Sequence, residues 1–161
     1  MKVLIADDEA VSRRLLQNYL QKWGHDVTVA ENGAEAWRLF EAGGFAVVIT
    51  DWEMPEMDGV ELVRRIRAAS SGPGYVYTIL LTAKSQKEDL VEGMEAGADD
   101  FLTKPFDRDE LRVRLRAGER IMQLEQELRR TKAALMHAEK LAGVGRLEAR
   151  PDHEAGPGNA E

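Results

Sequence analysis

Short apolar runs alternate along the first two thirds of the chain with stretches in which apolar residues recur every three or four positions. The short runs predict strands, and the three-and-four spacing predicts helices with one buried face. The predicted strands span residues 3–6, 26–29, 46–50, 78–81 and 101–103. The predicted helices between them span residues 11–23, 34–42, 60–69 and 87–96.

This order of elements predicts an α/β fold. Each strand is separated from the next by a helix, and parallel neighbours in a sheet need such a crossover connection. The first and third strands are almost purely apolar, which is typical of central strands that helices cover on both faces. We therefore expect a doubly wound parallel sheet of five strands.

A single long helix is predicted from Asp107 onward, because no breaker follows before Gly143. Beyond about Arg120 this helix can no longer cover the sheet, yet apolar and small residues continue at alternating three and four spacing. These residues are Ile121, Leu124, Leu128, Thr131, Leu135, Ala138 and Ala142. Such a heptad seam predicts a coiled-coil homodimer. A lone solvated helix is the alternative, and it would leave the leucines exposed.

The predicted organisation therefore has three parts. Residues 1–118 form the α/β domain, and residues 119–146 form a dimerisation helix continuous with the last helix of that domain. Residues 147–161 are rich in Gly, Pro and acidic residues, and we expect them to be disordered.

Composition narrows the range of partners. The 161 residues carry a formal net charge of -7, which argues against general binding to nucleic acid or to an anionic membrane surface. The absence of cysteine excludes disulfides, thiolate metal sites and thiol catalysis. The apolar runs are too short to span a bilayer, and the chain begins with a predicted strand instead of a signal peptide. We expect a cytoplasmic protein.

Charged and hydroxyl side chains stand where the predicted strands end. Asp7 and Asp8 follow the first strand, Asp51 follows the third, Thr82 follows the fourth and Lys104 follows the fifth. Ligands of open α/β sheets bind at these carboxyl ends. If the first and third strands are neighbours, three aspartates converge, and their mutual repulsion favours a bound cation. Oxygen ligands without His or Cys predict a hard ion, Mg²⁺ or Mn²⁺.

The same residues suggest phosphoryl chemistry. A carboxylate beside a divalent ion can attack a phosphoryl group and form an aspartyl phosphate. Asp51 is the candidate nucleophile, while the ammonium of Lys104 and the hydroxyl of Thr82 could hold the phosphoryl oxygens. Each residue alone has an ordinary explanation, such as a helix cap or a surface lysine. Their joint placement at the ends of separate strands is what favours a site.

Four stretches, "VLIADDE", "VVITDWEMPEMDG", "ILLTAK" and "GADDFLTKPF", resemble the receiver domain of two-component response regulators over about residues 1–118. The resemblance implies a flavodoxin-like strand order of 2-1-3-4-5. It also implies that Asp51 is the phosphoacceptor, that Asp7 and Asp8 are the acidic pair, and that the bond between Lys104 and Pro105 is cis.

The resemblance also implies a metal site and a switch. Asp8, Asp51 and the backbone carbonyl of Glu53 would bind Mg²⁺, and Asp7 would act through water. Thr82 would be the switch hydroxyl and Phe101 the switch aromatic. In "MPEMDG", Gly59 would adopt backbone angles that other residues resist.

Two further positions could tune the lifetime of the phosphoryl group. Glu53 lies two residues after Asp51, and Lys84 lies two residues after Thr82, at positions that in this family flank the path of the hydrolytic water. An exposed pair of negligible energy is the alternative explanation.

The segment "AEKLAGVGRLEARPDHEA" resembles the beginning of the dimerisation helix of histidine kinases, with His153 near the position of the phosphorylated histidine. We interpret it as a shortened kinase start that retains the dimerising part, without kinase activity.

The favoured function is thus a phosphorylation-controlled dimerisation module that receives phosphate from a partner histidine kinase and has no separate substrate. A phosphorylation-independent dimeric scaffold is the second hypothesis. A phosphatase that resembles haloacid dehalogenases is the third, but its nucleophile would belong near the first strand, where this chain has the acidic pair.

Overall fold

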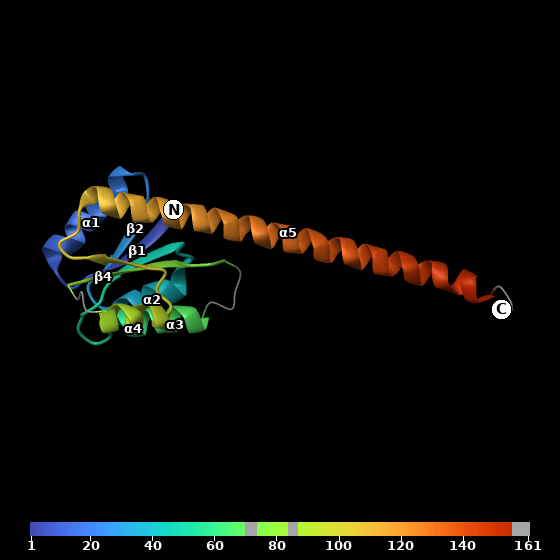
Figure 1. Cartoon of the computed structure of the whole chain (residues 1–161), viewed down its shortest axis with the longest axis horizontal. Helices are drawn as coiled ribbons and strands as arrows, with labels where there is room; N and C mark the ends of the chain where they lie inside the picture. Colours follow the sequence, from blue (N-terminus) through green and yellow to red (C-terminus); the bar gives the residue numbers. More distant parts are fainter. Residues whose placement is uncertain (70–73, 84–86, 156–161) are drawn as a thin grey trace. The chain divides into compact units, whose positions relative to one another are not determined.

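A five-stranded parallel sheet forms the centre of the α/β domain in the structure, which is a computed structural model of the chain (Figure 1). In chain order the strands are β1 (Lys2–Ala6), β2 (Asp26–Ala30), β3 (Val47–Asp51), β4 (Tyr77–Thr82) and β5 (Asp100–Thr103). In space their order is β2-β1-β3-β4-β5, which confirms the predicted doubly wound, flavodoxin-like sheet.

In the described residues five helices accompany the sheet, and the strands and the first four helices match the predicted elements to within a few residues at their ends. They are α1 (Ala10–Lys22), α2 (Gly33–Gly43), α3 (Gly59–Ala69), α4 (Lys87–Ala96) and α5 (Arg108–Ala155). Helix α1 and the beginning of α5 cover one face of the sheet, and α2, α3 and α4 cover the other (Figure 1).

Alternating side chains of the strands supply the two halves of the core. In β1, Val3 and Ile5 pack with Leu111 and Leu115 of α5, while Leu4 packs on the opposite face with α2 and α3. All residues of β3 and β4 are buried, and for β3 this confirms the predicted central strand. The core therefore fixes the strand ends, where the candidate site lies.

The structure describes residues 1–69, 74–83 and 87–155, with side chains as far as residue 143. Lys84 and the side chain of His153 lie outside the described residues, so the hypotheses about them stay predictions. The chain forms two compact units, Met1–Met122 and Gln123–Glu161. None of the described helices is long and apolar enough to cross a membrane.

Helix α5 belongs to both units. In the first unit its residues Leu111 and Leu115 are buried in the core. In the second unit it continues past the predicted boundary at residue 146 as far as Ala155. The predicted long C-terminal helix is thus confirmed, while its pairing into a coiled coil remains a prediction.

Candidate metal centre

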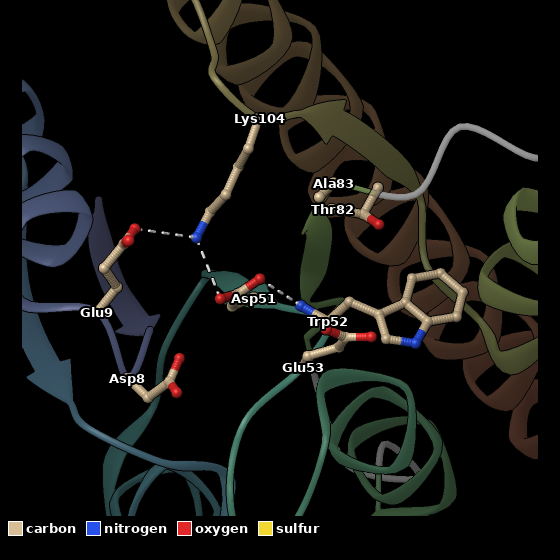
Figure 2. A pocket seen from close by; sticks show the side chains of 8 residues that line it. All are labelled: Asp8, Glu9, Asp51, Trp52, Glu53, Thr82, Ala83 and Lys104. Atoms are coloured by element: carbon tan, nitrogen blue, oxygen red, sulfur yellow. Dashed lines mark hydrogen bonds and ion pairs between the residues drawn. The ribbon is translucent and has the colours of Figure 1, made fainter.

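The candidate residues meet at the carboxyl edge of the sheet. Strand β1 lies between β2 and β3, so the connections that leave β1 and β3 pass to opposite faces, and a crevice opens between the two strand ends. Asp7 follows β1 there, Asp51 ends β3, Thr82 ends β4 and Lys104 follows β5. Figure 2 shows the pocket at this edge with Asp51 near its middle.

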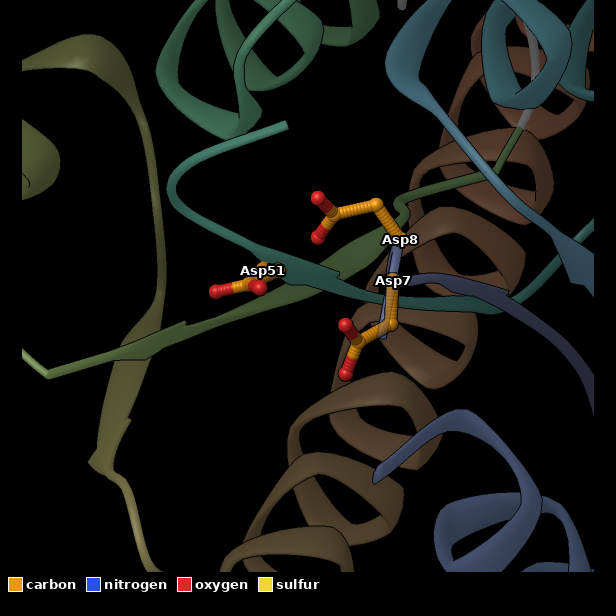
Figure 3. Close-up of side chains that lie close together, drawn as sticks. All are labelled: Asp7, Asp8 and Asp51. Carbon is orange, nitrogen blue, oxygen red and sulfur yellow. The ribbon is translucent and has the colours of Figure 1, made fainter. Parts of the chain in front are cut away.

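Three carboxylates converge in the crevice (Figure 3). One oxygen from each of Asp7, Asp8 and Asp51 lies within 4.8 Å of the others. Asp7 and Asp51 are buried, whereas Asp8 is exposed and accessible to a ligand from solvent. A cluster of carboxylate oxygens at this spacing, open on one side, suits a hard divalent cation that keeps some of its water, so the residues fit Mg²⁺.

Lys104 partly neutralises these acids. Its Nζ lies 3.1 Å from Asp51 Oδ2 and 3.3 Å from Asp7 Oδ2. Glu9, whose side chain is 66% exposed, is a weaker partner at 3.9 Å. The ammonium is therefore held between the ends of β1 and β3 (Figure 2). Its bond to the following Pro105 is cis, as the sequence resemblance implied.

Burial changes the acidity of the site. It raises the pKa of Asp51 to about 6, aided by the negative charge of Asp7 and opposed by Lys104. For Lys104, burial alone would lower the pKa, but hydrogen bonding and attraction to Asp51 and Asp7 outweigh it, so its pKa is raised. Asp51 is thus a carboxylate that a cation can deprotonate near neutral pH, beside a lysine that stays charged.

The backbone after β3 aims the carboxylate of Asp51. The Trp52 amide donates to Asp51 Oδ1 at 2.8 Å, and the Gly59 amide donates to the Trp52 carbonyl at 2.7 Å. A Cβ on Gly59 would lie 2.1 Å from the Asp51 carbonyl oxygen. The sequence prediction gave the wrong reason for this glycine, because the loop residue with a positive φ is Glu56, at 72°. Gly59 is needed for close approach.

Asp7 is held by residues for which the sequence suggested no role. The Glu9 amide donates to Asp7 Oδ1 at 2.9 Å, and Arg13 Nη1 donates to the Asp7 carbonyl at 2.8 Å. Arg13 lies in the first turns of α1, where an arginine is ordinarily interpreted as a solvated residue. Its contact with the Asp7 carbonyl arises because α1 packs back over the end of β1, which the sequence alone does not show.

A cavity of about 530 Å³ opens over these groups. Its lining consists of Asp8, Glu9, Asp51, Trp52, Glu53, Thr82, Ala83 and Lys104. Thr82 is fully buried at its edge. Glu53 also faces the cavity, as its predicted tuning role requires, and the volume is sufficient for a phosphoryl group with water.

An apolar cluster connects the site to α4. Trp52 packs with Val60, Val63, Leu80 and Ala98, and the partly buried Phe101 packs against the same group. A Cβ on Gly93 of α4 would come within 3.1 Å of the Trp52 ring, so the missing side chain lets helix and indole touch. The sequence resemblance implied a role for Phe101 but none for Trp52, although Trp52 directly follows Asp51.

The family model described as the response regulator receiver domain matches residues 3–116. Among curated proteins, the transcriptional regulatory protein SrrA of Staphylococcus aureus is 39% identical over 116 residues, which is 72% of this chain. That match covers 46% of SrrA, so the chain corresponds to about half the length of this relative.

Solved structures agree. The receiver domain of the Francisella response regulator 1452 superposes with a TM-score of 0.67 at 36% identity, over 73% of this chain and 94% of that one. The chemotaxis protein CheY4 of Vibrio cholerae gives a TM-score of 0.67 at 34% identity, over 72% and 96% of the two chains. Both similarities cover most of the α/β domain.

Proposed function

The chain belongs to the response regulator receiver domain family, and from that membership we propose that Asp51 accepts a phosphoryl group from a partner histidine kinase in a Mg²⁺-dependent reaction in the cytoplasm. The observation that carries the proposal is the approach of three carboxylates to within 4.8 Å of one another, with Lys104 Nζ 3.1 Å from Asp51 Oδ2. Residues held only for structure would rarely concentrate acids in this way.

The carboxylates of Asp8 and Asp51 and the backbone carbonyl of Glu53 would hold Mg²⁺, and Asp7 would act through a water molecule. When bound, the ion supplies positive charge that offsets the repulsion between the phosphoryl oxygens and the acids. Asp7 is fully buried, its carboxylate accepts from the Glu9 amide and its carbonyl accepts from the Arg13 guanidinium, which suits an indirect ligand that orients water.

In the transfer step, one carboxylate oxygen of Asp51 attacks the phosphorus of the kinase phosphohistidine. The new O–P bond forms as the P–N bond breaks, and the electron pair remains on the imidazole nitrogen, which then takes a proton. Lys104 donates to a phosphoryl oxygen in place of its present acceptors, and the hydroxyl of Thr82 donates to another. Asp51 must be ionised to attack, and the cation promotes that ionisation.

The output would start at Thr82 and Phe101. Phosphorylation adds roughly -1.5 to -2 charges and strong acceptor oxygens beside Thr82. As Thr82 moves toward them, Phe101 turns into the space that it leaves, which changes the surface formed by α4, β5 and α5. We propose that a dimer formed through α5 responds to this change. Glu53 and Lys84 would set the lifetime of the phosphoryl group.

The acceptor is tested by incubating the chain with Mg²⁺ and acetyl phosphate and measuring intact mass. We expect one added phosphoryl group, which is lost in Asp51→Asn and after removal of Mg²⁺ by chelation. Asp26→Asn, an exposed residue at the start of β2, is the matched control and should react normally. Unchanged uptake in Asp51→Asn would contradict the proposal. A chain that neither takes up phosphate nor responds to beryllofluoride would be the phosphorylation-independent scaffold.

A further inference from the structure

Helix α5 carries apolar side chains that nothing covers within the part of the chain that the structure describes. Leu124, Leu128 and Leu135 are 59%, 50% and 59% exposed. In the first unit, Ile121 is 42% exposed although its neighbour Met122 packs against the core. Met122 therefore supplies the contact with the core, and Ile121, one position earlier, continues the heptad spacing of the leucines in the sequence.

The charges beside this row can be assigned to heptad positions. With Ile121, Leu128 and Leu135 at position a and Leu124 at position d, position g holds Arg120 and Glu127. Position e then holds Glu125 and Lys132. In a parallel pair of helices, a g residue faces the e residue five positions later on the other helix. Arg120 would then face Glu125, and Glu127 would face Lys132, so both kinds of pair are attractive and each occurs twice.

The antiparallel arrangement is less favourable. There, e residues face e residues and g residues face g residues. Glu125 would face Lys132, whereas Glu127 would face Ala134 and Arg120 would have no acidic partner. The parallel arrangement thus makes four attractive pairs between helices and the antiparallel arrangement makes two.

From the exposed row and this charge pattern we infer that the occupant of the α5 row is a second copy of the chain, paired in parallel and in register. Arg120–Glu125 and Glu127–Lys132 contacts between the two copies set the register. The inference rests on the proposed dimer and adds its direction and its pairing residues. A receiver pair joined in this way would transmit a change in α5 symmetrically to both copies.

Disulfide crosslinking tests the direction, because the chain has no cysteine of its own. We expect Leu124→Cys and Leu135→Cys each to form a disulfide-linked dimer alone, since equal positions meet in a parallel pair. In the antiparallel register, residue 124 meets residue 135, so only a mixture of the two variants would crosslink. That result would overturn the parallel inference and leave the dimer standing.

Light scattering on the unaltered chain separates the two levels of the proposal. A monomer at all concentrations, with or without beryllofluoride, would contradict the proposed dimer and this inference together. A dimer that fails the crosslinking test contradicts the inference alone.

Charge exchange tests the pairing residues. We expect Lys132→Glu to weaken the dimer on the order of tenfold, because it turns two attractive pairs into repulsive ones. Adding Glu127→Lys should restore the affinity, while adding Glu125→Lys should weaken it further. In an antiparallel dimer, Glu125→Lys would be the variant that restores it. Lys140→Glu, the same charge change at an exposed position away from the row, is the control and should leave the affinity unchanged.

Discussion

The ammonium of Lys104 lies 3.1 Å from Asp51 Oδ2, although the two residues are 53 positions apart in the chain. The same nitrogen lies 3.3 Å from Asp7 Oδ2, so one cation bridges two acids of the candidate metal centre. In the proposed function it would therefore compete with Mg²⁺ for these carboxylates and would also hold a phosphoryl oxygen. Its removal should change these two properties in opposite directions.

We expect Lys104→Ala to bind Mg²⁺ more tightly, because the competing charge is gone, and to take up phosphate from acetyl phosphate roughly 100-fold more slowly. Calorimetry measures the first effect and intact mass over time measures the second. Lys87→Ala removes an exposed lysine of α4 and should change neither. Slower uptake caused only by weaker Mg²⁺ binding would contradict the role given to Lys104.

The pKa of Asp51 predicts a pH dependence. Burial raises the pKa of Asp51 from its ordinary 3.8 to about 6, so the folded chain without metal holds this proton up to about pH 6. Mg²⁺ must displace the proton, and its apparent affinity should fall by about tenfold per unit below pH 6. Calorimetric titrations over about three pH units, from about pH 5 to about pH 8, would show the change in slope.

The same shift affects stability. Because the folded pKa is raised, the contribution of the Asp51 proton is fully present below pH 3.8 and is lost as the pH rises through about 6. Relative to Asp51→Asn, the metal-free chain should therefore lose stability over that window. Urea unfolding of both proteins at matched pH measures the difference. A gain in relative stability with rising pH would show that the sign is wrong.

Most residues of the candidate metal centre could be predicted from the sequence, because the ends of the apolar runs mark the ends of the strands. The apolar runs stop at Asp7, Asp51 and Thr82, and parallel pairing brings such ends to one edge of the sheet. The strand order itself came from the family resemblance, since periodicity alone does not say which strands are neighbours.

Contacts between distant segments could not be predicted. Lys104 bridges Asp7 and Asp51 only because the ends of β1, β3 and β5 lie close together in the folded sheet. The contact of Arg13 with the Asp7 carbonyl depends on how α1 packs over the end of β1. For Gly59, its place in the "MPEMDG" loop predicted a special backbone angle, whereas the close approach of α3 to the Asp51 carbonyl is the actual reason. These features arise from tertiary packing, which has no local signal in the sequence.

Gly59→Ala should displace the backbone of Asp51. The added Cβ would lie 2.1 Å from the Asp51 carbonyl oxygen, so the loop after β3 must shift. We expect a loss of about 1–3 kcal/mol in unfolding free energy, together with weaker Mg²⁺ binding. Gly143→Ala lies within α5 and has open space around its Cβ, so it should not lower the unfolding free energy and should leave Mg²⁺ binding unchanged. Normal stability and Mg²⁺ affinity in Gly59→Ala would mean that the loop position does not matter to the site.

Thr82→Ala separates phosphate uptake from output. The hydroxyl of this buried residue is proposed to move toward the phosphoryl group and free space for Phe101, whereas Asp51 supplies the attacking oxygen. The variant should still gain one phosphoryl group by mass, but beryllofluoride should no longer alter its dimer affinity in light scattering. Thr28→Ala, in the edge strand β2, should retain the response. A full response in Thr82→Ala would remove this residue from the switch.

Arg67 of α3 ties together segments at the opposite edge of the sheet from the candidate site. Its guanidinium donates to the carbonyls of Gly97 and Val76 at 2.8 and 2.7 Å and pairs with Asp99 at 2.5 Å. Asp99 also accepts the Thr78 amide at 2.8 Å. This network joins α3 to the beginnings of β4 and β5.

We expect Arg67→Ala to cost about 3 kcal/mol of unfolding free energy, because it leaves the largely buried Asp99 charge without its cation. Arg65→Ala, two residues away on the same helix, removes only an exposed pair with Glu61 and should cost less than about 1 kcal/mol. Urea unfolding measures both. Since the network lies away from Asp51, the folded Arg67→Ala protein should bind Mg²⁺ as the unaltered chain does. Equal costs for the two arginines would show that burial of the Arg67 pair does not stabilise the fold.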